Sequence, residues 1–349
     1  MYQMNEKLSS MEPYEPAEGD FAVRLDANES FIKLPIVLYS KFAEELATIP
    51  FNRYPDPTAR KLCRAFADYY EIDPELVTAS NGSDEMIFIL LSAFLQKGEK
   101  VLLADPDFSM YRFYTTLTEN IPVVYRKNEN MGIDPQDLLQ TAEREKVSMI
   151  LFSNPCNPTS LGLGREQVRR IIEGTNALVV LDEAYMDFWD QSLLHEVEHY
   201  DNLIILRTSS KAFGLAAARL GFAVANPALT RAIRSVKSPY NVNSLSQKLG
   251  TVVLQAIPEQ QKALRRIRDS KQHLYSMLMA LKQRGAVIEP IDGVTNFIVV
   301  KTPRAEEIYN ELAARRIAVR CFPGFLRITA GSLAENSRLI AELEDILLQ

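Results

Sequence analysis

The chain has 349 residues, 47% of them hydrophobic and 24% charged, which indicates a globular protein long enough for one large core and a smaller one. Its net charge of -6 includes no basic block, which argues against a nucleic-acid partner. Three cysteines, odd in number and widely spaced, favour a reducing cytosol over a disulfide framework. We find neither a signal-peptide segment nor an apolar run of about 18 residues, so we expect a cytoplasmic protein with no membrane partner.

Short apolar runs alternate with helical patterns between residues 75 and 225. Helical periodicity lies at residues 81–95 and 165–175. The predicted strands lie at residues 100–106, 148–155, 177–185, 202–210 and 221–226. Buried strands that alternate with helices are typical of an α/β fold with a mostly parallel central sheet.

The pattern changes after Asn241 to long charged helical stretches, of which residues 259–285 are the longest. Extended runs follow at residues 296–302, 317–321 and 325–331, and a helical pattern closes the chain at 336–348. We therefore predict a large domain at residues 46–250. A smaller α+β domain would comprise residues 251–349 together with the N-terminal segment, residues 1–45.

Lys211 stands in an apolar setting, after the predicted strand at 202–210 and before the small, apolar stretch "AFGLAAARLGF". The carboxyl end of a strand in a parallel sheet opens into the crevice where such folds bind ligands. A lysine there can extend its amine to water. Alternatively, a desolvated lysine has a lowered pKa, and its neutral amine is a nucleophile that forms Schiff bases.

Other polar groups follow the ends of neighbouring strands. Ser83 and Asp84 begin a predicted helix, whose free N–H groups either form an anion site or are simply capped. Asn157 lies in a proline-bounded turn, while Asp182 and Tyr185 follow a very hydrophobic strand. An amine, an acid, an amide, a phenol and an anion cradle at one crevice are the groups that pyridoxal phosphate (PLP) requires.

The block "SSKAFGLAAARLGF" makes this indication specific, and "LDANES", "RYPDP", "NGSDE", "DEAYMDF", "PYNVNSLSQ" and "LRITAG" stand in the matching order. The chain resembles the PLP-dependent class I and II aminotransferases of the aspartate aminotransferase fold, and within them the histidinol-phosphate aminotransferase family. The resemblance spans nearly the whole chain. It implies a homodimer that exchanges the amino group of a small amino donor with a 2-oxo acid.

The resemblance also implies roles for individual residues. Lys211 would be the Schiff-base lysine, Asp182 would face the pyridine nitrogen, and Tyr185 would donate to the ring's phenolate oxygen. The remaining implied cofactor contacts are Asn157 at the phenolate oxygen, Phe108 stacked on the ring, and Ser83, Asp84, Thr208, Ser210, Arg219 and the other subunit's Tyr54 around the phosphate. The implied substrate contacts are Tyr14, Asn28, Arg320 and Arg327.

Three departures from the family pattern concern the substrate more than the chemistry. Phe108 stands where the family usually has tyrosine, so the ring face is kept without the hydroxyl. Ser160 stands where glycine is usual, and Arg320 and Arg327 are only seven residues apart. The alternatives within the fold are a threonine-phosphate decarboxylase and an aromatic amino-acid aminotransferase.

Two rival interpretations belong to other classes. His195, Glu196 and His199 match H-E-x-x-H, the zinc-binding helix of metalloproteases. The third histidine, His273, lies in a charged helix of the other domain, so we interpret this motif as a solvated connector and expect no metal. A cofactor-free sugar- or nucleotide-binding module could use the same sheet, but would leave the Lys211 and Asp182 pair without a purpose.

Overall fold

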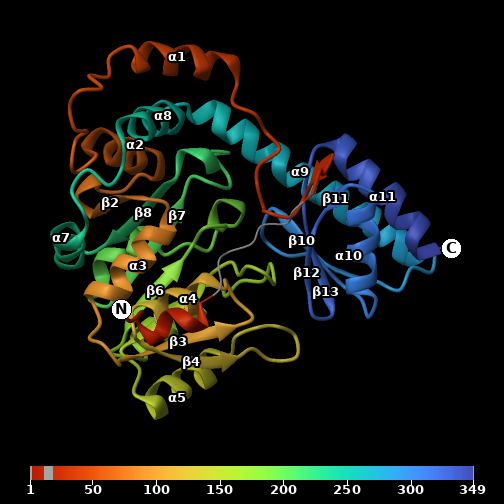
Figure 1. Cartoon of the computed structure of the whole chain (residues 1–349), viewed down its shortest axis with the longest axis horizontal. Coiled ribbons are helices and arrows are strands. Elements are labelled where there is room, and N and C mark those ends of the chain that lie inside the picture. The colour runs from red at the N-terminus through yellow and green to blue at the C-terminus, as the bar shows by residue number, and fades with distance from the viewer. Residues whose placement is uncertain (1, 12–18, 349) are drawn as a thin grey trace.

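The computed structural model describes residues 2–11 and 19–348, which fold into a large domain and a small domain side by side (Figure 1). The large domain is built on a seven-stranded sheet in the order β2-β8-β7-β6-β5-β3-β4. Its strands are β2 (Val77–Asn81), β3 (Lys100–Asp105), β4 (Ile121–Arg126), β5 (Met149–Ser153), β6 (Leu178–Asp182), β7 (Leu203–Thr208) and β8 (Leu220–Ala225). Only β8 runs antiparallel to its neighbours, so the predicted α/β fold with a mostly parallel sheet is confirmed.

Helices cover both faces of this sheet because its strands are apolar on both sides. In β5, Ile150 and Phe152 pack in one core cluster, whereas Met149 and Leu151 pack in another on the opposite face. The first cluster includes side chains of α2 (Arg60–Tyr70), α5 (Pro135–Glu145) and α6 (Arg165–Glu173). The second includes side chains of α3 (Ser83–Ala93), α4 (Met110–Leu117) and α7 (Pro227–Val236).

The small domain contains a four-stranded sheet in the order β12-β13-β10-β9. Its elements are α9 (Ile257–Gln283), β9 (Glu289–Ile291), β10 (Phe297–Lys301), α10 (Ala305–Ala314), β11 (Ile317–Ala318), β12 (Arg320–Phe322), β13 (Phe325–Thr329) and α11 (Leu333–Leu348). Helix α9 belongs to both domains, because Ile267 packs in the large-domain core while Leu274 and Leu278 pack in the small-domain core. No helix of the described residues is both long and apolar enough for a membrane span.

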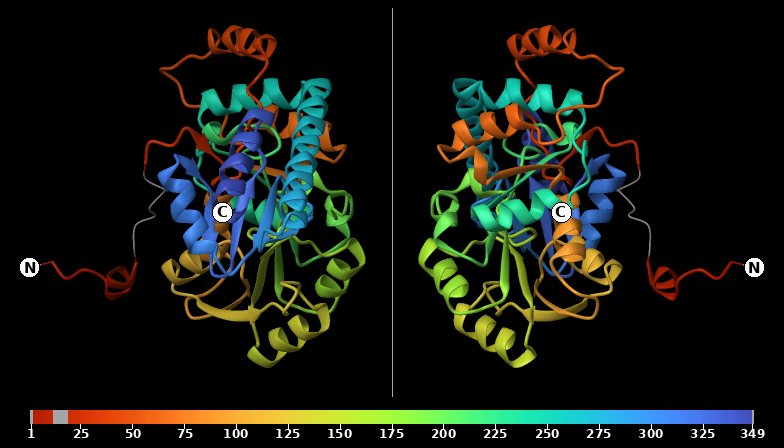
Figure 2. Two further views of the ribbon diagram at one scale, coloured as in Figure 1. Left: turned by 90° about the vertical axis from the view of Figure 1, so that its right-hand side faces the viewer. Right: turned by 90° about the vertical axis from the view of Figure 1, so that its left-hand side faces the viewer.

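The N-terminal segment contacts both domains. The short strand β1 (Val23–Arg24) pairs in parallel with β11 of the small domain. The helix α1 (Ile36–Leu46) instead lies outside α8 (Ser244–Leu254) of the large domain, at the top of the views in Figure 2. The assignment of residues 1–45 to the small domain therefore stays a prediction.

A glycine allows β8 to pass close to the start of α3. A Cβ atom built on Gly221 would lie 2.3 Å from the backbone nitrogen of Ser83 and 2.4 Å from the carbonyl carbon of Gly82. Those contacts are with backbone, which cannot move aside without shifting β2 or α3. Gly221 therefore fixes the position of the α3 N-terminus at the edge of the crevice.

We expect Gly221→Ala to destabilise the fold by about 1–3 kcal/mol, the usual cost of overpacking. The measurement is the thermal unfolding midpoint, with Gly132→Ala as the matched control. A Cβ built on Gly132 meets only the Asn128 side chain, at 3.5 Å. Equal midpoints for the two variants would show that β8 is not packed tightly against α3.

Candidate active site

A cavity of about 380 Å³ lies where the carboxyl ends of β5, β6 and β7 meet the small domain. Lys211 and Asp182 line it from the large domain, and Arg320 and Arg327 line it from the small domain. Parallel strands of α/β sheets bind ligands at this edge, so the position agrees with the general rule for such folds. The cavity is thus the first candidate for a catalytic site.

One end of the cavity has the composition of a phosphate cradle. Ser83 and Asp84 stand at the N-terminus of α3, where free N–H groups and the helix dipole favour an anion. Thr208 and Ser210 add two hydroxyl groups, 3.0 Å apart, at the end of β7. Arg219 adds a guanidinium, which contacts the Asp84 carboxylate at 3.2 Å.

The cradle depends on the absence of a side chain at Gly82. The φ angle of Gly82 is +83°, and a Cβ built there would lie 2.7 Å from Nη2 of Arg219. The residues present therefore fit a phosphate group, both in their donor chemistry and in the space left for it.

Asp182 lies at the end of β6 and is buried. Its Oδ2 accepts a hydrogen bond from the Tyr111 hydroxyl at 2.7 Å, and its Oδ1 accepts one from the backbone N–H of Ala184 at 3.0 Å. Burial raises the pKa of Asp182 to about 6, against the effect of these two donors. A carboxylate so placed has room for one further cationic donor, as a protonated pyridine nitrogen would be.

Lys211 reaches into the same cavity from the loop after β7. Its Nζ donates to the carbonyl oxygen of Ala27 at 2.9 Å and lies 6.0 Å from the centre of the Tyr185 ring. Burial, followed by the positive charge of Arg327, lowers the pKa of Lys211 to about 8. The lowered pKa supports the nucleophile interpretation of this lysine over the solvated one.

Two hydrogen-bond donors of the cavity are the Asn157 amide and the Tyr185 hydroxyl. Arg327 donates through Nη1 to Oδ1 of Asn157, so the Asn157 amide is oriented with its NH₂ group available. Asn28 donates to the Tyr185 hydroxyl oxygen at 2.8 Å, which leaves the Tyr185 hydrogen free to donate elsewhere. Burial raises the pKa of Tyr185 to about 12, so it remains a phenol at neutral pH.

Phe108 also lines the cavity, and its ring packs edge-on against that of Tyr111, with ring centres 5.5 Å apart. Sequence reasoning missed the role of Tyr111. The signal was its position three residues after Phe108, at the start of α4.

The arginine pair comes from a tight hairpin. Pro323 and Gly324, the latter at φ +82°, form the turn between β12 and β13, and Arg320 is the register partner of Arg327. The seven-residue spacing noted in the sequence therefore brings both arginines to one cavity. Arg327 also donates to the carbonyl oxygen of Asp26, next to the Asn28 loop.

Ser160 replaces a glycine of the family pattern without loss of the left-handed conformation, since its φ is +62°. Its hydroxyl lies 2.5 Å from that of Thr295, which ties the Asn157 turn to the small domain.

One predicted site residue in the described part of the chain, Tyr54, does not line this cavity in the single chain. Tyr54 is 81% exposed and stacks on Tyr240, with ring centres 4.6 Å apart. Tyr54 is predicted to contact the cofactor phosphate of the neighbouring subunit, and this role stays a prediction. Tyr14 lies outside the described residues.

The rival zinc motif does not form an α-helix. Leu194–His199 is a 3₁₀ helix, in which residues four apart point about 120° away from each other. Glu196 is paired with Arg169 at 2.6 Å. Within the described part of the chain, no three His, Cys, Asp or Glu side chains are grouped as a metal would require.

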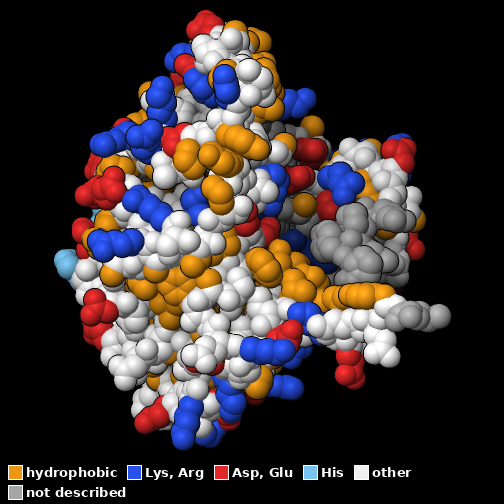
Figure 3. All heavy atoms as spheres, turned by 60° about the vertical axis from the view of Figure 1, so that its left-hand side comes forward, with side chains coloured by type: hydrophobic (Ala, Val, Ile, Leu, Met, Phe, Trp, Pro, Cys, Tyr) orange, Lys and Arg blue, Asp and Glu red, His pale blue; other side chains and the backbone are white. Residues whose placement is uncertain are grey.

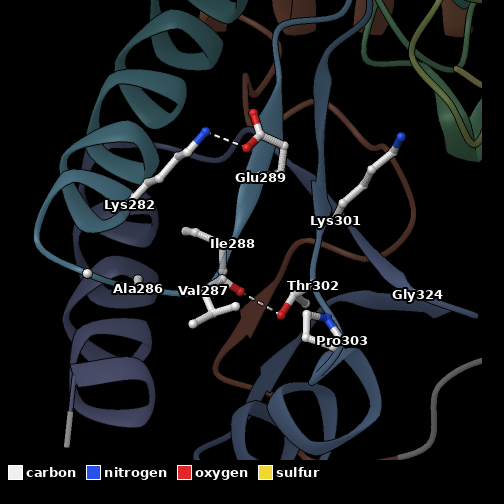
Figure 4. A pocket seen from close by; sticks show the side chains of 10 residues that line it. Lys282, Ala286, Val287, Ile288, Glu289, Lys301, Thr302, Pro303 and Gly324 are labelled. Atoms are coloured by element: carbon white, nitrogen blue, oxygen red, sulfur yellow. Dashed lines mark hydrogen bonds and ion pairs between the residues drawn. The ribbon is translucent and has the colours of Figure 1, made fainter.

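Another hollow, of about 640 Å³, lies on the small domain at the end of α9 and the edge strand β9 (Figure 4). Lys282 pairs there with Glu289, and the Thr302 hydroxyl donates to the carbonyl oxygen of Val287 at 2.9 Å. None of the predicted catalytic residues lines this open hollow. The cavity at Lys211 is therefore the candidate active site.

Comparison with known proteins shows the family of the chain. Residues 22–343 match the family "Aminotransferase class I and II", and the chain belongs to this family. The predicted family, enzyme class and PLP cofactor are thereby confirmed. The chain is 38% identical over 347 residues to a histidinol-phosphate aminotransferase of Clostridium kluyveri, covering 98% of both proteins.

Two further relatives agree. A histidinol-phosphate aminotransferase of Clostridium novyi is 39% identical over 344 residues, covering 95% of this chain and 94% of that protein. The fold is similar to the crystal structure of histidinol-phosphate aminotransferase from Sinorhizobium meliloti in complex with pyridoxal-5'-phosphate. That structure has a TM-score of 0.89 at 20% identity and covers 99% of this chain and 98% of its own.

We expect Tyr111→Phe to raise the pKa of Asp182 above its present value of about 6, because a donor to the charged carboxylate is lost. Asp182 would then carry its charge only at higher pH, and affinity for PLP would fall between about pH 6 and 7. The measurement is the Kd for PLP across pH 5–9. Tyr114→Phe on the same helix is the control, and an unchanged pH midpoint in Tyr111→Phe would contradict the assignment.

We expect the amine of Lys211 in the cofactor-free protein to become reactive near pH 8, because a lowered pKa makes it neutral above that pH. Exposed lysines ordinarily titrate near ~10.4 and provide the reference. Competitive acetylation between pH 6 and 10, read by peptide mass, measures both. A Lys211 curve that coincides with those of the exposed lysines would contradict a desolvated amine.

Proposed function

We propose that this chain is a PLP-dependent histidinol-phosphate aminotransferase, which converts histidinol phosphate and 2-oxoglutarate to imidazole-acetol phosphate and glutamate in histidine biosynthesis. The observation that carries the proposal is the pairing of Arg320 with Arg327 in register at the cavity. Like charges directly opposite each other on adjacent strands are unfavourable unless an anion lies between them.

The phosphate group of the substrate is the anion that suits this pair. Arg320 has no ion-pair partner among the described residues, and Arg327 donates to the side-chain oxygen of Asn157 and to the carbonyl oxygen of Asp26. Two guanidinium groups balance the two charges of a phosphate and can equally hold the carboxylate of glutamate in the second half-reaction. Asn28 and Tyr14 would complete this end of the pocket.

When bound, PLP supplies an electron-withdrawing ring that stabilises negative charge at the α-carbon of the substrate. Asp182 would hold the proton on its ring nitrogen, and Asn157 and Tyr185 would donate to its phenolate oxygen. Ser83, Asp84, Thr208, Ser210 and Arg219 would hold its phosphate, and Phe108 would cover its ring. Lys211 would bind its aldehyde carbon and, once displaced by the amino donor, move the proton at the substrate's α-carbon.

We also propose a homodimer, in which Tyr54 of each chain reaches the phosphate cradle of the other, and a cytoplasmic location. Large hydrophobic side chains are exposed on the surface, among them Ile36, Phe51, Tyr54 and Leu245. Hydrophobic patches are visible on the face shown in Figure 3. A second copy of the chain that covered such side chains would remove them from water, which supports a dimer.

The proposal predicts that the native enzyme prefers histidinol phosphate to histidinol and to phenylalanine. Arg320→Ala should lower kcat/KM for histidinol phosphate by about 10- to 100-fold, because hydrogen bonds to charged groups contribute about 1.5–3 kcal/mol. The same substitution should affect glutamate less, since a carboxylate carries one charge and Arg327 remains. The measurement is kcat/KM for all four donors in the native enzyme and in Arg320→Ala.

Lys301→Ala is the matched control, because it removes a cation from the small domain at the hollow of Figure 4, away from the cavity. Equal efficiency of the native enzyme on phosphorylated and unphosphorylated donors would overturn the assignment and leave a broad or aromatic aminotransferase. Release of CO2 from threonine phosphate would assign the chain to the decarboxylases instead.

A further inference from the structure

A second cavity, of about 280 Å³, lies behind the Asn157 turn. Cys156 and Lys127 line it, and Ser153 lines both this cavity and the candidate active site. Lys127 directly follows β4, and its Nζ donates a hydrogen bond to Sγ of Cys156 at 2.9 Å. The proposed reaction uses neither of these two side chains.

Lys127 is held as a buried cation at the sulfur. Its side chain is 2% exposed, and its Nζ donates to the carbonyl oxygen of Pro106 at 2.7 Å and lies 3.7 Å from the carboxylate of Asp107. Burial by itself lowers the pKa of Lys127, but Cys156 and Asp107 outweigh it, so the pKa is raised. The Sγ of Cys156, at 2.9 Å, is nearer to the ammonium than the carboxylate oxygen of Asp107, at 3.7 Å.

The other two cysteines lack this arrangement. Cys63 is as buried as Cys156, each being 4% exposed, and the Sγ of each faces a carbonyl oxygen at 3.6 Å, that of Thr58 for Cys63 and that of Pro106 for Cys156. Cys156 differs in the hydrogen bond that its Sγ accepts from the Lys127 ammonium. Burial raises the pKa of Cys63 to about 11. Cys321 is more exposed than either, and burial followed by the charge of Glu306 raises its pKa. An adjacent ammonium stabilises a thiolate, which is the reactive form of cysteine.

We propose that Cys156 is a site of reversible oxidation by small hydroperoxides, with Lys127 as the proton donor. The thiolate sulfur attacks the terminal oxygen of the hydroperoxide, an S–O bond forms, and the O–O bond breaks with its electron pair on the leaving oxygen. Sulfur is oxidised to a sulfenic acid and the peroxide is reduced. Lys127 protonates the leaving oxygen, giving water from hydrogen peroxide, and regains its proton from solvent.

The position of Cys156 connects this modification to the active-site wall. The backbone of Cys156 accepts from Ser160 N–H at 2.8 Å and donates to the carbonyl oxygen of Leu161 at 2.7 Å, so the turn is closed around it. Asn157, the next residue, bonds through its backbone N–H to the Ser153 hydroxyl at 3.2 Å. Cys156 lines the second cavity and Asn157 lines the cavity of Lys211, so oxygen added to the sulfur would enter the second cavity beside a residue of the active-site wall.

The test compares the three cysteines within one protein. Native holoenzyme is treated with hydrogen peroxide for timed intervals, the peroxide is removed with catalase, and the protein is denatured in dimedone. The reporter then need not enter the folded cavity, and peptide masses give the sulfenic acid at each position. We expect Cys156 to be oxidised at least 10-fold faster than Cys63, which has the same exposure, and faster than the more exposed Cys321. Dithiothreitol added before dimedone should restore the Cys156 thiol.

Two substitutions of Lys127 separate the effect of its charge on Cys156 oxidation from the effect of its size. Lys127→Met should slow oxidation of Cys156 by at least 10-fold, while Lys127→Arg, which keeps the charge, should stay within about 3-fold of the native rate. Oxidation of Cys321 first, or of Cys156 no faster than Cys63, would overturn the proposal. That ranking in the native protein decides the matter even if a Lys127 variant does not fold, and it does not depend on which amino donor the enzyme uses.

Discussion

The burial of charge around one cavity is the constraint on which the rest of this structure depends. A carboxylate, an amine and a guanidinium, those of Asp182, Lys211 and Arg327, must each be compensated in a site that excludes much of the solvent. Asp182 is compensated by two donors from the protein, Tyr111 and the backbone of Ala184. Lys211 is compensated differently, because burial lowers its pKa to about 8 and so favours its neutral form.

The loop after β1 supplies further hydrogen-bond partners for the polar side chains of the cavity. Three consecutive residues, Asp26, Ala27 and Asn28, contact Arg327, Lys211 and Tyr185 in turn. The loop is held by the small domain, since the backbone N–H of Asn28 donates to the Thr329 hydroxyl and Asn296 donates to the Asn28 carbonyl oxygen. Residues far apart in the sequence are thus joined into one wall, and the catalytic chemistry of the large domain relies on a loop that the small domain positions.

Those parts of the fold and of the candidate site that depend on neighbouring residues in the sequence could be predicted from it. The apolar strands β5, β6 and β7 and the polar residues that follow them could be located from their pattern alone, because both faces of a central parallel strand are buried. The reversed direction of β8 could not be predicted. The run at 221–226 has the same pattern in either direction, and its direction is seen only in its antiparallel pairing with β2 and β7.

Other features depend on geometry that no local pattern contains. The opposition of Arg320 and Arg327 depends on the exact register of a hairpin. The hydrogen bond from Tyr111 to Asp182 joins residues 71 positions apart. The spacing of His195 and His199 suits an α-helix, but the segment forms a 3₁₀ helix between β6 and β7. In each case the deciding contact is made by the tertiary fold, which a periodic pattern does not encode.

Helix α9 gives the two-domain arrangement a mechanical property. The helix has 27 residues, so it is about 40 Å long, and its side chains belong to the cores of both domains. The small domain therefore cannot rotate against the large one about a free hinge at this connection. A change in the width of the cavity at this connection requires elastic bending of one continuous helix, so the stiffness of α9 opposes opening and closing alike.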